Sequence, residues 1–331
     1  MKKLLLIATG GTIACQKTED GLAPQINPED FLAYVPEYKT ICTIDAIQIL
    51  NLDSTNIQPE DWISMAETVQ REYERYDGFV ITHGTDTMAY TAAALSYLIQ
   101  DSQKPIVITG SQKPIDASIT DAKKNLLDSI RFAADRHAKG VYIVFDGTAI
   151  VGTRARKVRS KSYHAFESID YPVAAFIDDS RIIHYFADQC VDAAVKFWTR
   201  LNPRIFLLKL VPGMEPDVLD YIADHYDVVV IECFGVGGIP FNNKRNFLDR
   251  LEKLHQRGII TVIASQVMSE GSDAEIYEVG SRAIHRFNVL QAFDMTVEAT
   301  MVKLMWITAE TKDFAEIKQK FYTRINNDIL A

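Results

Sequence analysis

The feature that most constrains the fold of this chain is the alternation of short apolar runs with longer segments of helical character. The runs are nearly all apolar and rich in β-branched residues, and they cover Gly78–Thr82, Pro105–Thr109, Val141–Phe145, Val228–Glu232 and Ile259–Ala264. Runs of this kind are typical of parallel strands that are covered on both faces. The strand–helix order therefore predicts an α/β fold built on a doubly wound, mainly parallel sheet.

The segments between these runs carry the signals of helix ends. Residues 58–76 place Pro59 near the first helical position and Glu60 and Asp61 in the first turn, where negative charge is favourable. The same reasoning predicts further helices over residues 89–99, 121–134, 245–256, 295–308 and 313–326.

The length and the rhythm of the pattern indicate two domains. At about 150 residues per domain, 331 residues suggest two. The strand–helix order lapses between residues 188 and 203 and resumes at Ile205–Leu208. We therefore predict a larger N-terminal α/β domain over residues 1–187, a linker over 188–203 and a smaller C-terminal α/β domain over 204–331.

The charge of the chain limits its partners. With 35 Lys and Arg against 44 Asp and Glu, the formal net charge is −9, which disfavours binding to nucleic acids and to anionic membranes.

The N-terminus has a basic start, but its apolar run covers only Leu4–Ala8, whereas a signal peptide needs about 7–15 apolar residues. We interpret this run as a buried strand. We expect a cytoplasmic protein, because no later stretch approaches the ~18 apolar residues of a membrane span.

The cysteines argue against a zinc site. Cys15, Cys42, Cys190 and Cys233 form no CxxC pair, and none has a histidine at metal-ligand spacing. Free buried thiols in a reducing compartment explain them better.

Ligands of open parallel sheets bind at the carboxyl ends of strands, so the residues after each predicted strand are candidates for a site. The first strand ends in TGGTIA (residues 9–14), whose two glycines place Thr12 at the mouth of the strand. A threonine hydroxyl becomes a nucleophile when a neighbouring base takes its proton. Because GxGxxG and the P-loop pattern are absent, a phosphate-binding turn is disfavoured, and an ordinary turn is the alternative.

Two other strand ends carry polar clusters. Gly78–Thr82 is followed by HGTDT (residues 83–87), in which a carboxylate can hold an ammonium group and a threonine can relay a proton. The alternative is that Thr85 or Asp86 caps the next helix. Residues 51–56 (NLDSTN) offer hydroxyls and amides to a carboxylate, or form a plain turn. We do not expect His83 to bind a metal, because no HExxH motif or nearby second histidine accompanies it.

Residues 154–161 hold five cations, namely Arg154, Arg156, Lys157, Arg159 and Lys161. For most of them a solvated face or an interface is the favoured interpretation. Like charges and burial both lower the pKa of a lysine, however, so one lysine of this cluster is a candidate base. The sequence alone does not indicate which one.

Four elements occur together in order: TGGTIA at 9–14, DST at 53–55, HGTDTMAYTAAAL at 83–95, and a lysine after the fifth strand. In this combination the chain closely resembles the bacterial L-asparaginases, specifically the cytoplasmic type I branch. ITGSQKP at 108–114, FGVGGIP at 234–240 and DMTVEATMVKL at 294–304 extend the resemblance over essentially the whole chain.

The resemblance implies a reaction and a nucleophile. The reaction is hydrolysis of L-asparagine to L-aspartate and ammonia, with Thr12 forming a β-aspartyl ester. The resemblance also implies two α/β domains and a homodimer or homotetramer whose active site lies near a subunit boundary. It implies no metal and no organic cofactor.

The resemblance further assigns the residues around the nucleophile. Thr85, Asp86 and Lys157 match the second catalytic group of the family, in which the lysine supports the threonine. Thr85 and Asp86 also match substrate-binding positions, because the carboxylate holds the α-amino group. The positions that bind the α-carboxylate are matched by Asp53, Ser54 and Thr55.

The sequence departs from the family pattern in two places. The family commonly carries a tyrosine on a mobile loop after the nucleophile, and here that position is Leu22. Tyr277 is a candidate replacement that would activate Thr12, with a plain packed tyrosine as the alternative.

Some type I enzymes bind asparagine as an effector, and an arginine of that site matches Glu232 here. An anion at this position should repel the effector carboxylate, so we predict no such regulation.

Two other functions stay open. An ammonia-releasing amidotransferase subunit shares these motifs but usually carries an extra N-terminal domain, and TGGTIA begins here at residue 9, which disfavours it. The other alternative is a non-catalytic module that binds amino acids on the same scaffold. The sequence does not determine the preference for asparagine over glutamine, because one methylene is worth only about 1–3 kcal/mol in a pocket.

Overall fold

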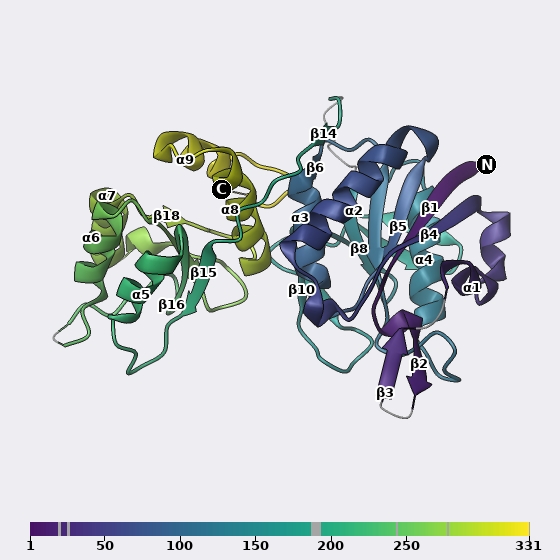
Figure 1. The fold of residues 1–331 in the computed structure, drawn as a ribbon, viewed down its shortest axis with the longest axis horizontal. Coiled ribbons are helices and arrows are strands. Elements are labelled where there is room, and N and C mark those ends of the chain that lie inside the picture. The colour runs from purple at the N-terminus through teal and green to yellow at the C-terminus, as the bar shows by residue number, and fades with distance from the viewer. Residues whose placement is uncertain (19–20, 25–26, 187–192, 243, 277, 331) are drawn as a thin grey trace. The chain divides into compact units, whose positions relative to one another are not determined.

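The structure is a computed structural model that describes residues 1–18, 21–24, 27–186, 193–242, 244–276 and 278–330. The chain divides into two compact units, Met1–Thr199 and Arg200–Ala331 (Figure 1). The first unit holds the larger, mainly parallel sheet, and the second holds a smaller parallel sheet with its own helices. The predicted α/β fold is therefore confirmed.

The first unit is built around an eight-stranded sheet with the strand order β13-β12-β9-β8-β7-β5-β1-β4. Strands β4, β1, β5, β7 and β8 run parallel, and β9, β12 and β13 extend the sheet in antiparallel fashion. The apolar run near the N-terminus lies in β1, which is next to the edge strand β4, and its residues Leu4–Ala8 are buried as predicted. The strands are β1 Lys2–Gly10, β4 Cys42–Leu52, β5 Gly78–Thr82, β7 Pro105–Thr109, β8 Gly140–Phe145, β9 Thr148–Val151, β12 Ala175–Asp178 and β13 Arg181–His184.

Helices cover both faces of this sheet. Alternate strand residues such as Leu4, Leu6 and Val80 pack with Leu126 and Ile130 of α4 in one apolar core. Helices α2 and α3 lie along the other face (Figure 1). Among the described residues of this unit the helices are α1 Pro28–Ala33, α2 Pro59–Glu72, α3 Met88–Leu98 and α4 Ala122–Ala134.

Small two-stranded sheets complete the first unit in the part of the chain that the structure describes. Strand β2 (Cys15–Thr18) pairs with β3 (Gly21–Pro24), and β10 (Ala155–Lys157) pairs with β11 (Phe166–Ser168). Strand β6 (Ile99–Gln100) pairs with β14 (Lys196–Phe197). Strand β14 thus lies within the stretch predicted as a linker, and it belongs to the first unit.

The second unit contains a four-stranded parallel sheet with the order β15-β16-β17-β18. Its core joins Val229 and Ile263 of the sheet with Leu219 of α5 and Leu251 of α6. Lys303 Nζ on α8 forms an ion pair with Asp328 Oδ2 at 2.6 Å, and both side chains are fully buried. The elements are β15 Ile205–Lys209, α5 Val218–His225, β16 Val228–Cys233, α6 Phe247–Gln256, β17 Ile260–Ser265, α7 Glu278–Phe287, β18 Leu290–Gln291, α8 Val297–Glu310 and α9 Phe314–Tyr322.

Two of the four cysteines have described side chains. Cys42 and Cys233 are free and buried, and burial raises the pKa of the Cys42 thiol to about 11. Cys190 and the side chain of Cys15 lie outside the described residues. Within the described ranges, no helix combines the length and the apolar character needed to cross a membrane.

Candidate active site

Three polar turns meet at the carboxyl edge of the first unit's sheet. Strand β1 lies between β4 and β5 and pairs with both in parallel, so the turns that follow these strands leave the sheet side by side. The turns comprise residues 11–14, 53–56 and 83–87. The structure therefore brings together the three clusters that the sequence places at strand ends.

Glycines allow these turns to touch. Gly10 and Gly11 have φ angles of +105° and +80°. A Cβ on Gly11 would lie 2.3 Å from the backbone nitrogen of Gly84, and a Cβ on Gly84 would lie 2.6 Å from Ser54 Oγ. No side chain fits at these distances, so the contact between the turns depends on glycine at positions 11 and 84.

Thr12 begins a short 3-10 turn, η1 (Thr12–Ala14), directly after Gly11. Thr12 is partly exposed, whereas Ile13 and Ala14 beside it are buried. Thr12 is therefore held at the rim of the sheet rather than in the apolar interior, which is the position that a nucleophile requires.

Strand β10 brings Lys157 to the turn after β5. Lys157 Nζ donates a hydrogen bond to Thr85 Oγ1 at 2.8 Å and forms an ion pair with Asp86 Oδ1 at 2.6 Å. Thr85 is 6% exposed, and the side chains of Lys157 and Asp86 are 15% and 57% exposed. The amine and the threonine hydroxyl are thus shielded, while the carboxylate is open to a ligand.

The other cations of residues 154–161 have different surroundings. Arg154 is fully buried, with its guanidinium 5.3 Å from the ring centre of Tyr171. Arg159 pairs with Glu167 at 2.7 Å. Of the five cations only Arg159 and Lys161 are exposed, so the interpretation as a mainly solvated face does not hold for Arg154. Arg156 and Lys157 are half-buried in β10, which pairs with β11.

The turn after β4 contains Asp53 and the 3-10 turn η3 (Ser54–Asn56). Asp53 Oδ1 accepts hydrogen bonds from Thr55 N at 2.9 Å and Thr55 Oγ1 at 3.0 Å, and both residues are exposed. Ser54 is buried: its Oγ accepts from Asp86 N at 3.2 Å, and its carbonyl accepts from Thr87 Oγ1 at 2.7 Å. Ser54 therefore joins this turn to the one that carries Thr85 and Asp86.

His83 is buried and carries its proton on Nδ1. That nitrogen lies 2.6 Å from the carbonyl oxygen of Gly84, which can only accept, so Nδ1 donates. Nε2 therefore accepts from Thr91 Oγ1 at 2.9 Å, and this hydroxyl accepts in turn from Trp62 Nε1 at 2.9 Å. Burial lowers the pKa of His83 to about 4. A neutral His83 thus fixes the main chain directly before Thr85, with both ring nitrogens occupied.

Some expected features lie outside the described residues. Tyr277, the candidate replacement for the loop tyrosine, is one of them. Leu22 lies in β3 opposite Lys17 of β2, and its side chain is also outside the described part. The described residues contain no group of three or more His, Cys, Asp or Glu side chains that could hold a metal ion.

Two buried polar residues near this site, Asp121 and Asn125, were not predicted from the sequence. The loop after β7 is held by Asp121, which precedes α4, and by Asn125 of α4. The signal that could have found them is the turn after Pro105–Thr109, because it ends the next parallel strand beside β5.

Comparisons with known proteins extend over both units. The family profile described as "Asparaginase, N-terminal" matches residues 3–189, and the one described as "Glutaminase/Asparaginase C-terminal domain" matches residues 204–321. An L-asparaginase of Thermococcus kodakarensis is 38% identical over 99% of this chain and 99% of its own length. A solved structure of the thermostable L-asparaginase from this organism matches with a TM-score of 0.94 and 39% identity, covering 99% of each chain.

Two further matches carry different names. A structure of L-asparaginase I from Vibrio cholerae has a TM-score of 0.89 and 28% identity, and it covers 100% of this chain and 99% of its own. A component of the glutamyl-tRNA(Gln) amidotransferase of Metallosphaera sedula is 31% identical, over 98% of this chain and 76% of its own length.

Proposed function

The chain belongs to the asparaginase family and hydrolyses L-asparagine to L-aspartate and ammonia, and we propose that it does so through a covalent ester on Thr12. The observation that carries this proposal is the contact of Lys157 Nζ with Thr85 Oγ1 and Asp86 Oδ1, beside the turn that begins with Thr12. A nucleophile, a proton-transfer pair and an anionic group for the substrate ammonium then share one edge of the sheet.

In the first half of the proposed reaction, Thr12 Oγ attacks the side-chain amide carbon of asparagine. As the carbon–oxygen bond forms, a neighbouring base takes the proton of the hydroxyl. The carbon–nitrogen bond then breaks, this proton passes from the base to the leaving nitrogen, and ammonia departs from a β-aspartyl ester. A well-placed general base contributes about 10²–10⁴-fold to such a step. Backbone N–H groups beside the glycine turn are candidate donors to the oxyanion, each worth about 10²–10³-fold.

In the second half, water attacks the ester and Thr12 leaves with a proton. We assign the activation of this water to Thr85 and Lys157. In its neutral form the amine of Lys157 can accept the proton of Thr85 Oγ1 while it still donates to Asp86, so Thr85 can take a proton from water. The 2.8 Å separation of Nζ and Oγ1 suits this transfer.

Besides its side-chain amide, the substrate carries an α-ammonium group and an α-carboxylate group, and we assign each of these charges to a different turn. Asp86, with a side chain 57% exposed, would hold the α-ammonium group. The backbone of Asp53 with the hydroxyls of Ser54 and Thr55 would hold the α-carboxylate. The contact of Ser54 Oγ with Asp86 N keeps these two binding groups together.

The alternatives are an amidotransferase-type subunit that releases ammonia for a partner enzyme, and a module that binds amino acids without turnover. Steady-state ammonia release from L-asparagine, L-glutamine and D-asparagine, measured side by side, separates them. We expect release from L-asparagine. A chain with glutamine as its best substrate would favour the amidotransferase alternative, and a chain that releases no ammonia would be a binder.

The Thr12→Ala variant tests the nucleophile. We expect it to lose turnover and still bind L-asparagine in calorimetry. Retained turnover would move the nucleophile elsewhere, with Thr85 as the next candidate.

We also propose a cytoplasmic homodimer or homotetramer that needs no cofactor, on the basis of the likeness to type I enzymes. Cell fractionation tests the location, light scattering tests the oligomeric state, and activity after exhaustive chelation tests the independence from metals.

A further inference from the structure

The loop of residues 110–121, which joins β7 to α4, contacts all three segments that carry the proposed catalytic residues. Toward Thr12, Ile115 N donates to the carbonyl of Ile13 at 3.3 Å. Toward Thr85, Gly110 lies against His83, because a Cβ on Gly110 would be 2.1 Å from the carbonyl oxygen of His83. Toward Lys157, Gln112 Nε2 donates to the carbonyl of Ser162 at 3.1 Å.

Asp121 fixes the backbone of this loop. Its Oδ2 accepts from Gln112 N at 2.8 Å, and its Oδ1 accepts from Lys113 N at 3.1 Å. Asp121 is only 7% exposed. A buried carboxylate that receives two backbone N–H groups holds the loop in one conformation, because leaving those donors unpaired is costly.

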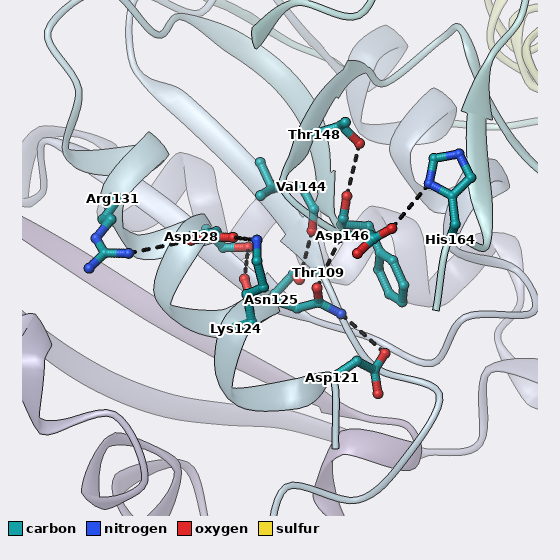
Figure 2. Close-up of polar contacts among 12 residues, drawn as sticks. Thr109, Asp121, Lys124, Asn125, Asp128, Arg131, Val144, Asp146, Thr148 and His164 are labelled. Carbon is teal, nitrogen blue, oxygen red and sulfur yellow. Dashed lines mark hydrogen bonds and ion pairs between the residues drawn. The ribbon is translucent and has the colours of Figure 1, made fainter. Parts of the chain in front are cut away.

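Asn125, one turn further along α4, joins the loop to the segment of Lys157 by a second route. Its Nδ2 donates to the carbonyl of Gly110 at 3.0 Å and to Asp121 Oδ2 at 3.3 Å. Its Oδ1 accepts from Asp146 N at 3.0 Å, and Asp146 Oδ2 contacts His164 Nδ1 at 3.1 Å (Figure 2). His164 lies between β10 and β11, in the same connection as Ser162 and after Lys157.

We propose that Asp121 and Asn125 are positioning residues that hold the hairpin of Lys157 at its working distance from Thr85. They act through two arms, Gln112–Ser162 and Asp146–His164, while Gly110 fixes the turn of Thr85 from the other side. This inference rests on the proposed function, and it assigns a task to residues that contact neither Thr12, Thr85 nor Lys157 directly.

The connection from β10 to β11 is closed on itself. Val158 N and Arg159 N donate to the carbonyl of Ala165, and these bonds lie within the connection, so they do not fix its position relative to the turn of Thr85. A misplacement of about 1 Å between catalytic groups can lower the rate by about 10²-fold while leaving ground-state binding nearly intact. Loosening the arms should therefore lower kcat more than it raises KM.

The test uses the outer ends of the two arms, because Gln112 is partly exposed and the His164 side chain is 52% exposed, so their loss should not unfold the chain. We expect the double variant Gln112→Ala/His164→Ala to lose about tenfold or more in kcat for L-asparagine, with KM within about twofold and the thermal midpoint unchanged. Gln112→Ala/His164→Asn should recover part of kcat, because Asn Nδ2 can replace His Nδ1 as the donor to Asp146. Asn125→Ala should lose more kcat than a variant that lacks one arm only, Gln112→Ala or His164→Ala.

Arg131→Ala is the matched control, since Arg131 lies on the same helix and contacts Asp128 at 3.5 Å, away from both arms (Figure 2). It should leave kcat unchanged. The inference is overturned if the arm variants keep wild-type kcat, or if the fall in apparent kcat is matched by an equal loss of folded protein, measured by circular dichroism and the thermal midpoint. If Asn125→Ala fails to fold, the arm variants still decide the question. A wild-type chain that released no ammonia would instead contradict the proposed function itself.

Discussion

A Cβ on Gly11 would lie 2.3 Å from the backbone nitrogen of Gly84, so the turn of Thr12 and the turn of Thr85 share a contact that only glycine permits. Each threonine directly follows one of these glycines. The separation of the two hydroxyl-bearing residues is therefore set by main-chain packing, which varies less than the rotamers of long side chains.

The first prediction concerns this contact. We expect Gly11→Ala to abolish most of the ammonia release and to lower the thermal midpoint, because the new methyl group forces the two turns apart. Gly213→Ala is the matched control: Gly213 has φ +95°, and nothing lies within 4 Å of its Cβ position. The control should cost only the backbone strain of about 1–2 kcal/mol and keep full activity. Equal effects of the two substitutions would show that strain, not contact, matters at position 11.

The second prediction concerns the amine. We expect Lys157→Met to lower kcat by about 10²-fold or more, because the proton of Thr85 then has no acceptor. Lys161→Met removes a lysine from the same cationic cluster, but its side chain is exposed, so it should behave like the wild type. Steady-state kinetics at saturating L-asparagine compare the two. Activity in Lys157→Met close to that of Lys161→Met would remove Lys157 from the mechanism.

The third prediction separates substrate binding from chemistry. If Asp86 holds the α-ammonium group, Asp86→Asn should raise KM for L-asparagine by about 10–100-fold, as expected for the loss of a charge-assisted hydrogen bond. Succinamate has the same amide but no α-amino group, so its slow hydrolysis should be far less sensitive to the substitution. A parallel loss for both substrates would place the main role of Asp86 in supporting Lys157 instead.

The fourth prediction is a dependence of stability on pH. The pKa of His83 is about 4 in the folded chain against an ordinary value of 6.5, so between these values the unfolded chain binds a proton that the folded chain does not. The contribution of His83 to stability is therefore complete above pH 6.5, and about 3 kcal/mol of it is lost as the pH falls toward 4.

The variant His83→Asn isolates this effect. It retains a donor for the carbonyl of Gly84, and its side chain does not titrate in this range. Because the other titratable groups are the same in both proteins, a difference in their pH dependence reports on His83. Denaturant unfolding between pH 4 and 7 should show the stability of the wild type falling more steeply than that of the variant. Parallel curves would contradict the assignment of a buried neutral His83.

The fifth prediction concerns regulation. Glu232 is 5% exposed near the end of β16, and the resemblance to type I enzymes matches it to an arginine of an effector site. An acidic side chain there should repel a carboxylate, so we expect hyperbolic kinetics with a Hill coefficient of about 1. Sigmoidal dependence of the rate on L-asparagine would contradict this expectation.

The strands that position the site were predictable from the sequence because they are buried on both faces. Gly78–Thr82 and Pro105–Thr109 have the predicted bounds, and all ten of their residues are buried. The antiparallel strands β12 and β13 were not predicted, since they are four residues long and alternate between the inside and the outside of the sheet. The last helix ends at Tyr322 rather than at the predicted residue 326, because the main chain leaves the helix at Thr323.

The site was only partly predictable. The ends of the predicted strands indicated Thr12, Thr85 and Asp86 as candidates, because the carboxyl ends of parallel strands lie at one edge of the sheet. Charge did not distinguish Lys157 from its neighbours, and only the resemblance selected it. Asp121 and Asn125 were missed because their contacts are with the main chain of other segments, and only the place of their loop after Pro105–Thr109 indicated them.

The contacts that join the turns of Thr12 and Thr85 to the hairpin of Lys157 all involve residues that precede Arg200, where the second unit begins. Domains generally fold as units, and the N-terminal one folds first during synthesis. The framework of the reaction centre can thus assemble on the ribosome while the remaining two fifths of the polypeptide are still being translated.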